Sequence, residues 1–144
     1  MMTMTKKFKV LSKFVKDMSS ETPNIETYLH VKDHISKYQL NIEINSKAIK
    51  NELIEVNTTF QFKEPQEKSK KSFFEINFAT IIKVEEEAKK NKNELEKIIL
   101  SDVQIEIYPD LEKIFLSLLE NSGYPGIKFE KKVDFEKLYN QKFN

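Results

Sequence analysis

The most constraining feature of this chain is a set of segments in which apolar and polar residues alternate. Residues 39–45 read Gln-Leu-Asn-Ile-Glu-Ile-Asn, and residues 53–62 and 73–83 keep the same two-residue period. Side chains of a β-strand point to opposite faces in turn, so this period predicts strands with one buried and one solvent-facing side. With a less regular segment at residues 8–17, the pattern predicts a four-stranded antiparallel sheet with one wet face.

The period also assigns faces within each predicted strand. In the segment 73–83 the residues predicted to face the core are Phe74, Ile76, Phe78, Thr80 and Ile82. In the first strand one face is predicted to carry Phe8, Val10, Ser12 and Phe14, and the other Lys9, Leu11, Lys13 and Val15. Residues 25–38 show no clean period and are predicted to form a long apolar loop with at most a helical turn. Residues 63–71, with Pro65 and a charge cluster, are predicted to form a turn.

The second half of the chain changes to a helical period. A short stripe of Leu95, Ile98 and Ile99 precedes a long helix that is predicted to begin at Tyr108-Pro109 and to end before Gly123. Asp134 is predicted to cap a short last helix that carries Phe135, Leu138 and Tyr139. Strands followed by helices indicate an α+β fold, and 144 residues suit a single domain over residues 1–144. Residues 1–7 are expected to be a disordered N-terminus.

The apolar surface of the long predicted helix is wider than one core requires. Its apolar residues cover about 200° of the helix circumference, whereas a stripe of about 100° is enough for a helix that lies on one core. Leaving the surplus in water would forfeit about 25 cal/mol for each Å² of apolar surface. We therefore expect an obligate oligomer whose interface includes Leu111, Ile114, Phe115, Leu118 and Leu119.

Composition argues against several classes of function. The chain has no cysteine and only two glycines, Gly123 and Gly126, so neither thiolate chemistry nor a glycine-rich phosphate loop can be formed. We expect no enzyme activity and no cofactor. Lys+Arg number 24 against 23 Asp+Glu, a net charge of +1, which favours neither nucleic acid nor an anionic membrane as a partner. A secretory or membrane-spanning segment is not predicted, so the expected location is the cytoplasm.

His30 and His34 lie four residues apart, beside Asp33. Two imidazoles at this spacing could share a metal on a helix, but the glutamate of a metalloprotease motif is missing. We expect solvated side chains and no metal site.

The opening strand carries the most specific pattern in the sequence. Residues 8–24 read Phe-Lys-Val-Leu-Ser-Lys-Phe-Val-Lys-Asp-Met-Ser-Ser-Glu-Thr-Pro-Asn. This stretch closely resembles the N-terminal strand of the bacterial protein-export chaperone family SecB, and the likeness extends over residues 8–141. The aromatic–proline pairs Tyr108-Pro109 and Tyr124-Pro125 are similar to those that bracket the long helix of that family.

The resemblance implies an assembly and a docking face. Family members form a dimer of dimers, a homotetramer in which first strands join and long helices pack between the sheets. Their outer sheet surface binds the zinc-binding tail of the motor ATPase SecA. The matching residues here are Asp17, Glu21, Phe73 and Glu75. This chain departs from the family in being near neutral, since family members are strongly acidic.

The resemblance also implies a function. Family clients are unfolded preproteins held in apolar grooves, and the matching candidates are Tyr28, Leu29, Ile35, Tyr38 and Tyr124. The expected function is an ATP-independent holdase that delivers preproteins to SecA. One alternative is a SecB-like chaperone dedicated to one client, such as an antitoxin. A second is a small nucleic-acid-binding domain, for which steep salt dependence of binding would be the sign.

Overall fold

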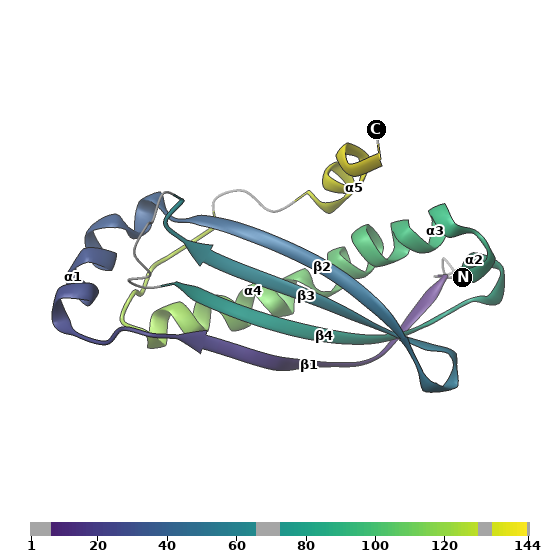
Figure 1. Ribbon diagram of the computed structural model, residues 1–144, viewed down its shortest axis with the longest axis horizontal. Coiled ribbons are helices and arrows are strands. Elements are labelled where there is room, and N and C mark those ends of the chain that lie inside the picture. The colour runs from purple at the N-terminus through teal and green to yellow at the C-terminus, as the bar shows by residue number, and fades with distance from the viewer. Residues whose placement is uncertain (1–6, 66–72, 130–133, 144) are drawn as a thin grey trace, which may run out of the picture.

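The sheet predicted from the alternating segments is present in the computed structural model, which describes residues 7–65, 73–129 and 134–143 (Figure 1). Its order is β1-β4-β3-β2, and all three pairs of neighbouring strands are antiparallel. The strands are β1 (Phe8–Ser20), β2 (Gln39–Ile49), β3 (Leu53–Lys63) and β4 (Phe74–Val84). The predicted fold class of a four-stranded antiparallel sheet with helices is confirmed. Residues 1–6 and most of the predicted 63–71 turn lie outside the described residues.

Helices follow the sheet and cover one of its faces (Figure 1). After α2 (Glu86–Lys90) and α3 (Lys92–Lys97), one π-helical turn (Ile98–Asp102) leads into α4 (Val103–Asn121), which runs along the sheet. The last helix is α5 (Phe135–Phe143), and α1 (Ile25–His34) joins β1 to β2 through a short 3₁₀ turn (Ile35–Lys37). None of the described helices is long and apolar enough to cross a membrane.

The core lies between the inner face of the sheet and α4. The inner residues predicted on β4 are all buried, as are Val56, Phe60 and Phe62 on β3. On α4 a buried stripe recurs every four residues, formed by Val103, Ile107, Leu111, Phe115 and Leu119. This spacing places apolar side chains over one another on a single helix face, which packs on the sheet.

Two predictions about the helices are wrong. Residues 25–38 form α1 and the 3₁₀ turn and are not a loop, because the Asn24 side chain caps the helix by accepting a hydrogen bond from Thr27 N at 2.8 Å. The long helix begins at Val103 and not at Pro109, which lies inside α4. Proline has no backbone N–H, so the Ile105 carbonyl loses the donor that residue 109 would otherwise supply. Both Pro109 and Ile105 are exposed to water.

The face assignment along β1 is also wrong, because β1 carries two bulges. The register pairs Val10 with Ile82 but Phe14 with Ala79, so Phe14 lies on the outer face, opposite to Phe8 and Val10. A bulge adds an unpaired residue and moves every following side chain to the other face. The second bulge, between Val15 and Asp17, reverses the first. Asp17 therefore returns to the outer face, where it was predicted.

Candidate functional site

An apolar groove runs along the inner side of β2, which is an edge strand of the sheet. Its wide part has a volume of about 880 Å³, and its apolar lining includes Ile35, Tyr38, Leu40, Ile42, Phe62 and Phe129. A narrower part of about 180 Å³ is lined by Ile42, Ile44, Leu100, Phe135, Leu138 and Tyr139. Ile42 and Leu138 line both parts, so we treat them as one continuous feature and call it the β2 groove.

The walls of the β2 groove come from both halves of the chain. Leu40, Ile42 and Ile44 alternate on β2 and are only half-buried, because α4 covers the centre of the sheet and leaves this edge free. The opposite wall is the segment Gly126–Phe129 together with α5. Among the described residues that line either part, Lys128 is the one that carries a charge, so this lining offers mainly apolar contacts.

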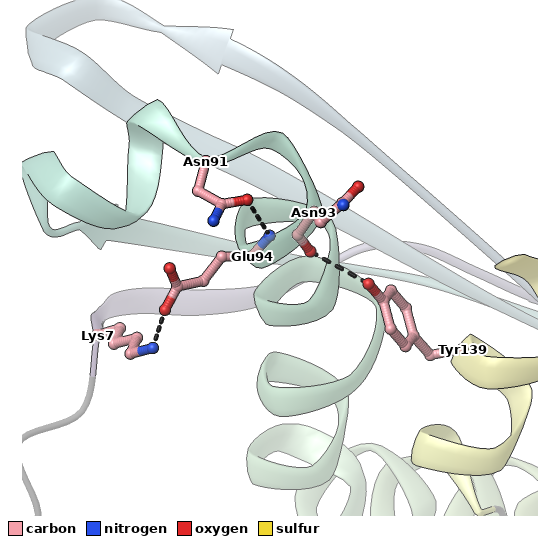
Figure 2. Close-up of polar contacts among 5 residues, drawn as sticks. All are labelled: Lys7, Asn91, Asn93, Glu94 and Tyr139. Carbon is pink, nitrogen blue, oxygen red and sulfur yellow. Dashed lines mark hydrogen bonds and ion pairs between the residues drawn. The ribbon is translucent and has the colours of Figure 1, made fainter.

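Helix α5 is held over the groove by a contact with α3. Figure 2 shows Tyr139 of α5 pointing to α3, where its hydroxyl donates to the Asn93 carbonyl at 3.1 Å. Asn91 accepts a hydrogen bond from Glu94 N at 3.2 Å and so caps α3, and Glu94 pairs with Lys7, the residue directly before β1. These contacts fix α3 to β1 and α5 to α3. The narrow part of the groove therefore has an anchored wall.

The structure divides the predicted client-binding residues into two groups. Ile35 and Tyr38 line the β2 groove, although each is largely buried. Tyr28 and Tyr124 stack on each other with ring centroids 5.4 Å apart, and burial raises the pKa of Tyr124. Leu29 stays half exposed on α1. The apolar and aromatic residues of the β2 groove that were not among these candidates are Leu40, Ile42, Ile44, Phe62, Leu100, Ile127, Phe129, Phe135, Leu138 and Tyr139.

The turn after α4 depends on Gly123, as predicted. Its φ of +102° is in the left-handed region that favours glycine, and a Cβ there would lie 2.9 Å from Tyr28 Cε1. Gly123 thus ends the helix and lets the Tyr28 ring pack close to the turn.

The predicted SecA-docking residues lie at one end of the outer face. Asp17 pairs with Asn77 and Ser19 with Glu75, so Asp17 and Glu75 share this face on neighbouring strands. Glu21 follows the end of β1 and is exposed, and Phe73 precedes β4 with 40% of its surface exposed. These four residues form what we call the docking face.

Only part of the predicted oligomer interface lies on a free surface. Leu111, Phe115 and Leu119 are buried in the core of their own chain and are no more than 1% exposed, so they belong to the fold itself. Ile114 and Leu118 are half-buried and line a groove of about 610 Å³ between β1 and α4. The remaining lining of that groove includes Val15 and Met18, both well exposed on β1.

The two histidines are engaged with protein groups. Their rings stack with centroids 4.2 Å apart, His30 Nε2 lies 3.1 Å from Glu64 Oε2, and His34 Nδ1 lies 2.7 Å from the His30 carbonyl. Within residues 7–65, 73–129 and 134–143, no group of three or more His, Asp or Glu could hold a metal.

Comparison with known proteins decides the family. The family model described as "Preprotein translocase subunit SecB" matches residues 2–144. This chain belongs to the SecB family. A putative protein-export protein SecB of Pelagibacter ubique is 59% identical over 98% of this chain and 100% of its own length.

More distant SecB proteins are similar as well. The protein-export protein SecB of Rhodopseudomonas palustris is 24% identical over 92% of this chain and 80% of its own length. Among solved structures, the Mycobacterium tuberculosis SecB-like chaperone in complex with a peptide from an antitoxin has a TM-score of 0.62 at 12% identity. The match covers 88% of this chain and 91% of that one, and at this identity it supports the fold alone.

Proposed function

We propose that this chain is a cytoplasmic, ATP-independent holdase that binds unfolded preproteins in the β2 groove and delivers them to a SecA motor. The observation that carries the proposal is a continuous apolar groove along a free sheet edge in a SecB family chain. Relatives with protein-export names favour export over service to a single client. The alternative of a dedicated antitoxin chaperone draws on the antitoxin peptide bound to the M. tuberculosis protein.

Binding in the groove would follow from burial of apolar side chains. Each Å² of apolar surface removed from water contributes about 25 cal/mol, and folded clients have already buried theirs. The chaperone would therefore bind the unfolded state and hold it by mass action without nucleotide. Leu40 to Ile44 spans about 13 Å of strand, which matches several residues of an extended segment.

We propose that four chains assemble as a dimer of dimers. The support is the apolar surface that a single chain leaves in water along β1 and α4, where Phe14, Val15, Met18 and Ile105 are each at least 38% exposed. Edge strands such as β1 also present backbone groups that can pair with a second chain. Sedimentation velocity measures the assembly, and a stable 17.1 kDa monomer would contradict it.

The holdase proposal is tested with the wild-type chain. A denatured preprotein is diluted into buffer without nucleotide, and its aggregation is followed by light scattering. We expect suppression that saturates as the chaperone concentration rises and is unchanged by added ATP. Aggregation at the same rate with and without the chain would refute the holdase activity.

The delivery step predicts the effect of reversing charge on the docking face. The variant Asp17→Lys with Glu75→Lys places two cations where the zinc-binding tail is proposed to dock. Charges at the solvent-exposed edge of an interface have a moderate effect on affinity, so we expect the tail to bind about tenfold more weakly at low salt. Aggregation suppression should persist, since the β2 groove lies on the other face of the sheet. Tail affinity equal to that of the wild type would place docking elsewhere.

A further inference from the structure

Two glutamates on the outer face of the sheet are held in different ways. Glu55 Oε2 accepts from Lys16 Nζ at 2.9 Å and from Asn57 Nδ2 at 2.8 Å. The hydrogen bond from Lys16, followed by the one from Asn57, lowers the pKa of Glu55. The charge of this carboxylate is thus balanced by a cation of the same chain.

Glu75 is held by a neutral group instead. Gln61 lies directly opposite Glu75 in the β3–β4 register, and its Nε2 donates to Glu75 Oε2 at 3.0 Å. Both residues are half-buried. Among the residues that the structure describes, the other carboxylate oxygen of Glu75 has no donor. An amide donor orients the carboxylate but leaves its negative charge uncancelled.

We propose that Gln61 is a positioning residue of the docking face, which orders the Glu75 carboxylate so that its free oxygen meets a cationic side chain of the docking partner. This inference rests on the proposed docking of a SecA tail. A side chain that is already ordered loses less conformational entropy when the partner binds. Cationic groups hydrogen-bonded to a carboxylate form stronger contacts than neutral pairs, so the orientation of that oxygen matters for affinity.

The neighbouring side chains support this role. Asp17 of β1 lies on the same face and pairs with Asn77 of β4. Asn77 is two residues after Glu75 on that strand. Within the described part of the chain, Asp17 forms no ion pair. The docking face therefore presents two carboxylates, Asp17 and Glu75, that no cation among the described residues neutralises, while Glu55 farther along the same face is neutralised by Lys16.

The test measures binding of a synthetic zinc-loaded SecA tail peptide by calorimetry at low salt. Gln61→Leu removes the donor at similar size and is expected to weaken binding about fivefold, the equivalent of one hydrogen bond. Gln61→Lys keeps a donor but adds a cation, and is expected to weaken binding more. Gln39→Leu is the matched control, because Gln39 is exposed on the same face at the distant edge strand.

A double-mutant cycle separates positioning from a merely structural effect. In a Glu75→Gln background, Gln61→Leu should cause no further loss of affinity, since the carboxylate it orders is gone. Equal losses of affinity in both backgrounds would overturn the inference. It would also be overturned if the Gln61→Leu variant binds the peptide as tightly as the wild type while the Glu75→Gln variant binds it more weakly. Wild-type affinity for Glu75→Gln would overturn the docking face together with this inference, and so would a wild-type chain that does not bind the peptide.

Discussion

Ile42→Asp is expected to reduce the affinity for unfolded preproteins about 100-fold. Ile42 lines both parts of the β2 groove, so an apolar client segment that crosses from one part to the other must cover this position. Covering a carboxylate without a partner costs several kcal/mol, and a loss of about 2.7 kcal/mol corresponds to the 100-fold change. Fluorescence anisotropy of a labelled, denatured preprotein measures the affinity.

Two further variants make this result interpretable. Asn45→Asp adds the same charge to the same strand, but at an exposed position on the outer face, and should bind clients as the wild type does. Ile42→Ala removes apolar contact without adding charge and should weaken binding only a few-fold. Circular dichroism checks that each variant is folded. A folded Ile42→Asp chain with the affinity of Asn45→Asp would show that clients bind outside the β2 groove.

The sheet was predictable from sequence because alternation follows directly from strand geometry. It located all four strands and the inner face of β4, whose register with β3 no bulge interrupts. The period failed on β1, since Leu11 and Lys16 have no partner in the ladder and each shifts the side chains that follow. Bulges depend on the neighbouring strand, so the sequence of β1 alone does not reveal them.

Local capping chemistry could have located α1. Asn24 is a favoured N-cap residue and Glu26 is an acid in the first turn, a combination that signals a helix start. The apolar residues of α1 form only a weak stripe. Two of its residues are buried, Thr27 and Val31, and just one of these is apolar. A search for periodicity alone therefore missed the helix.

The β2 groove could not be predicted from one segment. One wall consists of the half-buried, alternating side chains of β2, but the opposite wall is formed by Gly126–Phe129 and α5, more than 80 residues later in the sequence. The alternating pattern predicts that Leu40 and Ile42 face inward, but it does not distinguish a half-buried residue from a fully buried one. Only the path of the C-terminal segment decides that these side chains border a groove.

Gln104→Leu is expected to lower the free energy of unfolding by about 3 kcal/mol. Gln104 is fully buried where the π-helical turn joins α4. Its Oε1 accepts from Thr58 Oγ1 of β3 at 2.8 Å, and its Nε2 donates to the Ile99 carbonyl at 3.1 Å. Leucine would leave the buried Thr58 hydroxyl without this partner and remove one bond from the Ile99 carbonyl, and each such loss costs about 1–3 kcal/mol.

Replacing both partners distinguishes hydrogen bonding from packing. In Gln104→Leu with Thr58→Val, no hydroxyl is left unpaired, so part of the lost stability should return although the Ile99 bond is still missing. Gln39→Leu makes the same chemical change on the surface and should alter stability by no more than about 0.5 kcal/mol. Urea unfolding at one fixed protein concentration measures all of them, because stability of an oligomer depends on concentration. If the double variant is less stable than Gln104→Leu by the full cost of Thr58→Val alone, the two side chains act independently, and their hydrogen bond does not help to hold α4 on the sheet.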